Sequence, residues 1–237
     1  MIDVAAGSVL HAGSVADNCL LRNEWVCPLY VTTRSEQILA ALQQHVAILL
    51  VTLAVSVLLA LPLAVLAHRT AWVRGFVLGA STVVYTIPSL AMFSLLLPVI
   101  GFSARTVVVA LVLYSLTVLV RGLVAGLDAV PGEAVDAAVG MGYGRWRLLR
   151  EVQLPLALPT AFAGLRIAAV STVALTTIGF LFDSGGLGNL VNQGLTSYFK
   201  AEVLTATVLC VVLAVLVDLL LVGLRRWLTP WRRGVAA

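Results

Sequence analysis

PGEAVDAAVGMGYGRWRLLREVQLPLALP, residues 131–159, is the longest charged and turn-rich interruption of a chain that is otherwise mostly apolar. Its first half, residues 133–140, has alanine and valine at helical spacing and two acids near its start, where a helix dipole stabilises negative charge. A bend should follow, because glycine lacks the Cβ atom that restricts φ. The glycines of this bend are Gly140, Gly142 and Gly144.

The second half of the stretch, residues 145–153, predicts a further amphipathic helix of one or two turns, with Arg145 and Arg150 among its basic side chains. Pro155 and Pro159 predict its end, since proline lacks the N–H donor that a helix interior needs. Two short helices joined by a glycine bend, between apolar segments, predict a docking projection and not a membrane span.

The composition indicates an integral membrane protein. Of the 237 residues, 61% are hydrophobic and 11% are charged, whereas soluble domains average about 25% charged residues. The formal net charge is +4, and Lys200 is the only lysine, so the basic residues are almost all arginine. They flank apolar runs instead of forming a basic patch on a polar surface, which disfavours nucleic-acid binding.

The spacing within the opening stretch is specific. It is carried by Asp136, Ala137, Ala138, Gly142, Val152, Gln153, Leu154 and Pro155. This spacing resembles the EAA loop of ABC-importer permeases, which reads Glu-Ala-Ala, three residues, Gly, nine residues, then Ile-x-Leu-Pro. Asp136 and Val152 depart from the usual Glu and Ile, but they keep the charge and the branching. The residues alone leave open an ordinary cytoplasmic loop of another transporter.

The resemblance implies an all-α membrane protein, a type I ABC-importer permease core of about five transmembrane helices with a cytoplasmic coupling-helix loop. It also implies four partners: a dimer of ATPase subunits that binds ATP and Mg, a second permease copy or paralogue, an extracytoplasmic substrate-binding protein, and membrane lipid. The residues expected to couple this chain to the ATPase are Glu133, Asp136, Ala137, Ala138, Gly142, Arg145, Arg150 and Pro155.

Five apolar runs are long enough to cross a bilayer. They cover residues 46–67, 75–98, 106–126, 158–182 and 203–224. We expect an extracytoplasmic tail with an amphipathic lead-in, a transmembrane permease domain that contains the coupling loop, and a short cytoplasmic tail. Their bounds are 1–40 for the first tail, 41–226 for the domain, 128–157 for the loop and 227–237 for the second tail.

The second run is interrupted, which marks it as a candidate lining of the transport route. Pro88 frees a backbone carbonyl, which in lipid must find another partner. Irregular backbone at membrane depth is tolerated where it lines a cavity, although a proline kink packed on neighbouring helices remains the alternative. The expected lining residues here are Tyr85, Thr86, Pro88 and Ser89. The phrase Thr-Ile-Pro-Ser-Leu-Ala also resembles the osmoprotectant (glycine betaine, choline) branch of the permeases.

A Gly-Gly-Leu-Gly element follows the fourth run and resembles one at the extracytoplasmic end of the same span in osmoprotectant importers. Gly185 and Gly186 begin this element, and we expect them to belong to the transport route. Asp183 departs from the small neutral residues usual there. Its carboxylate could attract a cationic substrate, cap a helix or contact the binding protein.

The N-terminal tail has four acids and two bases within residues 1–40, which suits translocation without a cleaved signal. Cys19 and Cys27 could form a disulfide in that compartment, or they could remain free thiols. Two charges inside the spans have local explanations. We expect Arg121 to reach the cytoplasmic headgroups, and Asp218 to pair with the nearby arginines or to reach the membrane surface.

The basic residues divide unequally across the membrane. With five spans and the N-terminus outside, four of the 15 lie outside and 11 lie in the cytoplasm, in agreement with the positive-inside rule. The outer four are Arg22, Arg34, Arg105 and Lys200. The same topology predicts that residues 131–159 are cytoplasmic, where an ATPase could reach them. We expect a bacterial inner-membrane protein with its C-terminus inside.

The chain shows no catalytic machinery of its own. The phosphate-binding loop of an ATPase, GxxxxGK[ST], needs a lysine that Lys200 does not supply, because no such loop precedes it. No metal-ligand spacing or nucleophile–base pair is visible. The expected function is therefore uptake of compatible solutes by alternating access driven by a partner ATPase. A methionine or other amino-acid importer is the alternative within the class. A secondary transporter would show inverted repeats and paired acids at mid-membrane, and a simple membrane anchor would need no interrupted span.

Overall fold

The computed structural model describes residues 18–182 and 184–231, and within these residues the chain forms helices and no strand. Four helices are long and apolar enough to cross a membrane, or five spans when the bent pair α4 and α5 counts as one, as the sequence predicted. The spanning elements are α3 (Ser35–Arg69), α4 (Ala71–Thr86), α5 (Ser89–Ile100), α6 (Ala104–Asp128), α9 (Leu154–Thr176) and α11 (Lys200–Leu228).

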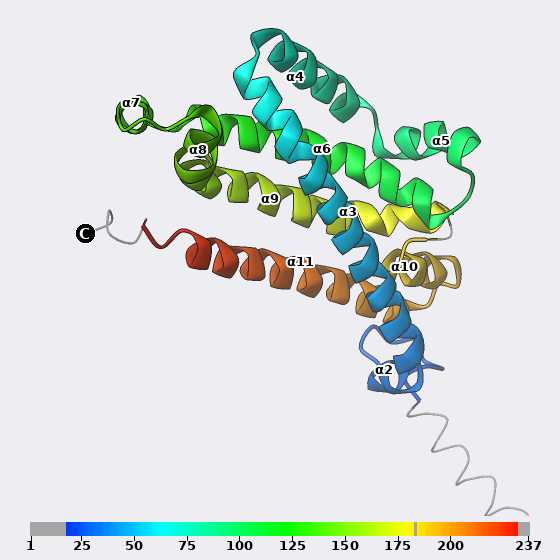
Figure 1. Cartoon of the computed structure of the whole chain (residues 1–237). Coiled ribbons are helices and arrows are strands. Elements are labelled where there is room, and N and C mark those ends of the chain that lie inside the picture. Colours follow the sequence, from blue (N-terminus) through cyan, green and yellow to red (C-terminus); the bar gives the residue numbers. More distant parts are fainter. Residues whose placement is uncertain (1–17, 183, 232–237) are drawn as a thin grey trace, which may run out of the picture.

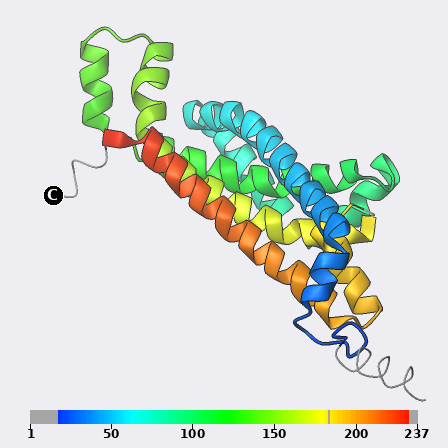
Figure 2. The same ribbon diagram turned by 90° about the horizontal axis from the view of Figure 1, so that it is seen from below.

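Shorter elements lie at the two ends of these helices (Figure 1). They are α2 (Pro28–Thr33), α7 (Gly132–Gly140), α8 (Arg145–Leu148), a π-helical segment (Leu149–Gln153), a 3-10 segment (Thr177–Phe182) and α10 (Leu187–Thr196). Helices α7 and α8 lie at one end, called here the hairpin end, and α2 and α10 lie at the other, called the disulfide end. Figure 2 shows the α7–α8 hairpin extending beyond the packed helices.

Helix α6 is the centre of the packing, with α3 and α9 against it. Small residues let α6 and α9 approach closely, as is common between helices in membranes. A Cβ atom on Gly122 of α6 would lie 3.1 Å from the Cα atom of Gly164 of α9. The Ser115 and Thr172 hydroxyls meet at 2.9 Å in the same buried interface. This interface joins the first and second halves of the chain.

The segment expected to lead into the first span forms the first turns of α3, which begins at Ser35. Helix α3 runs unbroken through it and through Pro62, over 35 residues. At about 1.5 Å per residue such a helix is longer than the roughly 30 Å hydrocarbon layer. The helix is therefore long enough to extend past the hydrocarbon layer, and its first turns pack against α2.

The prediction that Pro155 and Pro159 end the hairpin's second helix is wrong. The helix continues from Arg145 to Phe182. Directly before Pro155 it widens into the π-helical segment, where the Leu154 amide donates to the Leu149 carbonyl, five residues back. The wider turn gives room to a proline ring that would otherwise clash with the carbonyl four residues earlier. The helix that returns from the hairpin is thus continuous with the α9 span.

Candidate functional site

The bend between α7 and α8 is a Schellman motif. The amide of Tyr143 donates to the Ala138 carbonyl at 3.0 Å, and the amide of Gly142 donates to the Val139 carbonyl at 2.9 Å. Gly142 has φ +82°, whereas a Cβ atom added to it would touch nothing. The left-handed backbone, and not lack of space, is therefore what requires glycine at this position. Gly140 ends α7 and Gly144 precedes α8 at φ −72°, so only one of the three glycines is needed for its conformation.

The hairpin brings together most of the residues expected to couple to an ATPase. Among the residues of α7, Ala138 is buried, whereas Glu133, Asp136 and Ala137 are exposed. Exposed residues of α8 and the π-helical segment include Arg145 and Arg150, while Pro155 lies at the start of α9. The exposed acids and the exposed arginines thus lie on adjacent arms of one projection.

The returning arm is stiffened by its own side chains. The Nε atom of Arg147 donates to the Glu151 carboxylate at 3.0 Å, one helical turn further on. The Arg147 guanidinium also lies 4.2 Å from the centre of the Tyr143 ring. These contacts join the bend to the π-helical segment, so the hairpin can move as one body.

A polar clamp that the sequence reading missed holds the base of the hairpin. Asp128, the last residue of α6, accepts from Arg74 at 2.7 Å and lies 2.9 Å from the Nδ1 atom of His68. This one carboxylate joins the end of α3, the start of α4 and the end of α6. The sequence offered one signal for this clamp: residues 68–74 contain a histidine and two arginines but no acid, so an acidic partner had to come from elsewhere in the chain.

The interruption between α4 and α5 is a sharp break, with 101° between the two helices. Pro88 lacks the N–H that would bond to the Val84 carbonyl, which accepts instead from the Ile87 amide at 3.3 Å. The Ile87 carbonyl, at the break itself, accepts a hydrogen bond from the Tyr114 hydroxyl of α6. The Tyr85 ring lies edge-on to the same tyrosine at 6.3 Å. Tyr85, Thr86 and Pro88 are exposed and Ser89 is half-buried. Whether these residues line a transport route stays a prediction.

The Gly-Gly-Leu-Gly element is a buried turn packed between α3 and the 3-10 segment. Gly186 has φ +52°, and an added Cβ atom would lie 2.7 Å from the His45 backbone and side chain. A Cβ atom on Gly185 would lie 2.3 Å from the Phe180 nitrogen, and one on Gly188 2.1 Å from the Thr177 oxygen. Such approaches admit only glycine. Their role in the route stays a prediction, and Asp183 lies outside the described residues.

His45 supports this turn from α3. Its side chain is fully buried, and its Nε2 atom lies 3.2 Å from the Val173 carbonyl of α9. The imidazole therefore joins α3 and α9 directly beside Gly186. Periodicity along α3 could mark His45 as an inward position, but it could not show which turn packs on it.

The disulfide end has a clasp made by residues 18–27. Cys19 and Cys27 are joined, with 5.5 Å between their Cα atoms, which is the first of the two alternatives that the sequence left open. Inside this loop, Asn23 donates to the Tyr198 carbonyl at 2.8 Å and accepts from the Lys200 amide at 2.9 Å. The loop therefore caps the turn between α10 and α11.

Beside the clasp, Tyr30 packs edge-on against Phe199 at 5.2 Å. Burial, and then the negative charge of Glu202, raise the pKa of the Tyr30 hydroxyl above its ordinary value. The hydroxyl therefore stays protonated and neutral at physiological pH. An aromatic and polar layer thus joins α2 to the first turn of α11.

The two charges in the spans make contacts that local spacing did not indicate, and the expected local pairing of Asp218 is wrong. Asp218 of α11 does not pair with its sequence neighbours; its carboxylate accepts two hydrogen bonds of 2.7 Å from Arg166 of α9. Arg121 donates to the Thr82 hydroxyl of α4, and its reach to the headgroups stays a prediction. Both pairs join helices that are distant in sequence, which local spacing cannot reveal.

A site for a metal ion is not evident. Within residues 18–182 and 184–231, no group of three or more histidine, cysteine or acidic side chains could hold one. The features that the described residues do present are a stiff hairpin, a broken helix and close-packed glycine turns.

Sequence comparison finds relatives over most of the chain. The family model described as "Binding-protein-dependent transport system inner membrane component" matches residues 53–234. The osmoprotectant import permease protein OsmW of Salmonella typhimurium is 34% identical over 192 residues, covering 79% of this chain and 89% of that protein. The glycine betaine/carnitine/choline transport system permease protein OpuCD of Bacillus subtilis is 34% identical over 174 residues, covering 73% and 76%.

Structure comparison agrees on the fold. A chain of the MetNI methionine ABC transporter in an inward-facing conformation has a TM-score of 0.72 and 22% identity, covering 81% of this chain and 96% of that one. A chain of an amino acid ABC transporter with histidines has a TM-score of 0.68 and 19% identity, covering 85% and 98%. At these identities the likeness extends to the fold alone.

Proposed function

Because the chain belongs to the family of binding-protein-dependent transport system inner membrane components, we propose that it takes up compatible solutes such as glycine betaine, choline, carnitine or proline betaine. In this proposal it is the permease subunit of an ATP-driven ABC importer. It has the all-α fold of type I ABC-importer permeases. The substrate class is supported by the names of relatives that cover most of both chains.

The observation that carries the coupling role is the geometry of the α7–α8 hairpin. It is a stiff projection with exposed acids, closed by the one glycine whose φ demands it. An ATPase subunit would bind this projection through Glu133, Asp136 and Ala137, while Arg145 and Arg150 flank the contact. ATP and Mg would be bound by that subunit, because this chain has no phosphate-binding loop.

The mechanism we propose is alternating access. The hairpin continues through the π-helical segment into α9, so a displacement of the hairpin is transmitted into the membrane core. ATP binding would favour one packing of the spans and hydrolysis the other, because a ligand shifts an equilibrium only by its different affinity for the two states. A binding protein would deliver solute at the disulfide end, near Gly185 and Gly186.

A second permease copy or paralogue would complete the route. The most apolar part of α11 has no residue buried within this chain, and α4 has no buried residue at all. These helices therefore have surface available for lipid or for a partner permease. The route would run past Tyr85, Thr86, Pro88 and Ser89 at the break between α4 and α5.

The test is uptake in a strain that lacks only this gene. Uptake of labelled glycine betaine, choline or carnitine should be lost and should return with the wild-type chain. Loss of methionine uptake instead would favour the amino-acid importer. Normal uptake by a Gly142→Trp variant present at wild-type level in the membrane would contradict the coupling role of the hairpin.

Crosslinking tests the docking face directly. In a Cys210→Ala background, Ala137→Cys on the exposed face of α7 should crosslink to the ATPase subunit. Val31→Cys, exposed on α2 at the opposite end, is the matched control and should not. The reverse pattern would overturn the proposed orientation.

A further inference from the structure

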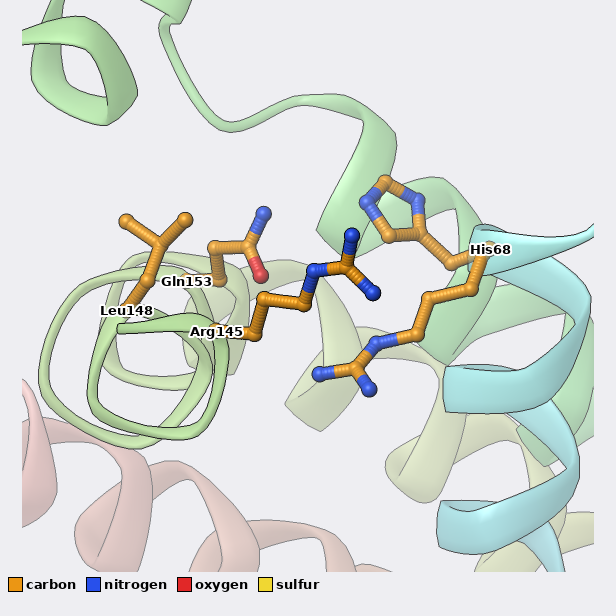
Figure 3. Close-up of a pocket in the computed structure, with 5 residues that line it drawn as sticks. His68, Arg145, Leu148 and Gln153 are labelled. Atoms are coloured by element: carbon orange, nitrogen blue, oxygen red, sulfur yellow. The ribbon is translucent and has the colours of Figure 1, made fainter. Parts of the chain in front are cut away.

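A groove lies at the hairpin end between the last turns of α3 and the returning arm of the hairpin. Its polar part is a cavity of about 400 Å³ lined by His68, Arg69, Arg145, Leu148 and Gln153. Figure 3 shows Arg145 and Gln153 on the returning arm, across from His68 at the end of α3. The adjoining apolar part, about 530 Å³, includes Leu61, Val65, Leu66 and Leu154, with Arg69 again in its lining.

His68 in this groove is paired with Asp128, but three arginines that line it have no acidic partner among the described residues, and one of them, Arg150, borders the apolar part. Arg69, Arg145 and Arg150 form no ion pair within the part of the chain that the structure describes. The Arg69 guanidinium lies over the Trp146 ring, 5.5 Å from its centre, which leaves its N–H donors unpaired with any acid. Like charges that face one shared cavity repel each other unless an anion lies between them.

We propose that this groove binds one anionic phospholipid, with its phosphate between Arg69 and Arg145 in the polar part and an acyl chain along the apolar part. The shape and chemistry of the groove argue for an amphiphile. Inorganic phosphate would leave the apolar part in water, and an acidic peptide has no long alkyl chain to fill it. Basic pockets between helices at a membrane surface are typical binding sites for anionic headgroups.

The position in the bilayer agrees with this occupant. Arg69 is the last residue of α3, where a membrane-spanning helix leaves the hydrocarbon. Leu61 and Leu66 are 41% and 52% exposed on the same helix, on the side where lipid would contact it. The bound lipid would connect α3 to the moving hairpin, so it would act on the coupling element itself. The binding of a lipid in this groove requires only that the protein is inserted in a membrane, and it does not depend on which solute is transported. Its effect on the coupling element rests on the proposed function.

The test is lipid retention by the purified permease–ATPase complex, measured by native mass spectrometry with phosphatidylglycerol. Phosphatidylcholine with the same chains and inorganic phosphate are the comparison probes. Arg69→Gln should lower phosphatidylglycerol retention roughly fivefold, the effect of removing one basic residue near an anionic headgroup. Arg225→Gln is the matched control. It removes one arginine from the last turn of α11, at the hairpin end but outside the groove, and should change phosphatidylglycerol retention less than twofold.

A second variant tests the apolar part without altering charge. Val65→Trp fills the groove and should displace phosphatidylglycerol while the complex stays assembled. Equal retention of phosphatidylcholine would overturn the proposal, as would binding of inorganic phosphate with the affinity of the lipid. Retention of the lipid by the isolated permease but not by the permease–ATPase complex would also overturn it, because a protein would then be the occupant of the groove.

Discussion

Gly142 lies in open space, yet its backbone conformation excludes other residues. At φ +82° an L side chain is strained by about 1–2 kcal/mol. Gly142→Ala should therefore weaken the hydrogen bond between the Tyr143 amide and the Ala138 carbonyl. Hydrogen exchange of the bend should become roughly fivefold to tenfold faster.

The matched control for this prediction is Gly140→Ala. Gly140 ends α7 with open space around it and no left-handed φ, so alanine should leave exchange at the bend unchanged or slow it slightly. Equal effects of the two substitutions would mean that the Schellman geometry does not hold the bend.

Gly186 is restricted in two ways. Its φ of +52° disfavours any L side chain, and the adjacent His45 backbone leaves no room for a Cβ atom. Gly186→Ala should destabilise the protein by about 2 kcal/mol or more, from strain and overpacking together. Thermal unfolding in detergent measures this. Gly223→Ala, at an open position of α11, should be neutral, and a neutral Gly186→Ala would contradict the packing of this turn.

At the scale of elements, the contact between α9 and α11 depends on a two-bond ion pair. Asp218→Asn leaves the Arg166 guanidinium without a carboxylate partner, and Arg166→Gln leaves the Asp218 carboxylate without a cationic partner. Each single variant should lower the melting temperature by a few degrees. The double variant should lose less than the sum of the two, because removing both partners leaves no unpaired charge.

A double-mutant cycle by thermal unfolding, with transport measured alongside, checks this prediction. Strictly additive losses would show that the two side chains do not interact. A double variant that regains stability but not uptake would give the pair a role in the transport cycle as well.

The elements also show how a local rule can be overridden. Proline alone predicts a helix end, yet α9 continues past Pro155 because the π-helical segment precedes it. At Pro88 the same rule holds, since the chain bends by 101° there and the Tyr114 hydroxyl bonds to the Ile87 carbonyl at the break. The helix therefore continues at Pro155 and breaks at Pro88 because the surrounding backbone and side chains differ, although both residues are prolines.

At the scale of the whole molecule, the clasp at the disulfide end joins the N-terminal loop to the turn before α11. A disulfide that closes so short a loop contributes about 2–3 kcal/mol by limiting the unfolded chain. Cys19→Ser with Cys27→Ser should therefore release residues 18–33 locally and speed their proteolysis. Helices α3, α6 and α9 should keep their melting temperature, because α3 and α9 pack mainly against α6.

Cys210→Ala is the control for the clasp, since Cys210 is a free thiol in α11 and its loss should not affect proteolysis of the loop. Asn23→Ala, which removes the hydrogen bonds to Tyr198 and Lys200 but keeps the disulfide, should release the loop in part. Unchanged proteolysis in both the double-serine and Asn23→Ala variants would contradict the clasp.

Much of this protein can be predicted from the sequence because the relevant signals are local. Apolar run length predicted the spans, and the spacing from Asp136 to Pro155 predicted the hairpin and the family. Glycine and proline chemistry predicted the bend at Gly142 and the break at Pro88. Each of these depends on residues within a few turns of one another, where composition and backbone preference decide the outcome.

Contacts between distant segments were decided by the tertiary structure alone. The sequence does not say that Asp218 pairs with Arg166, that Asp128 joins three helix ends, or that the glycine turn packs on His45. These pairings depend on how α3, α6, α9 and α11 lie against one another, which is a property of their combined packing and of the small residues between them. The sequence by itself therefore determined what kind of protein this is, and the folded chain determined which of its charges and glycines hold it together.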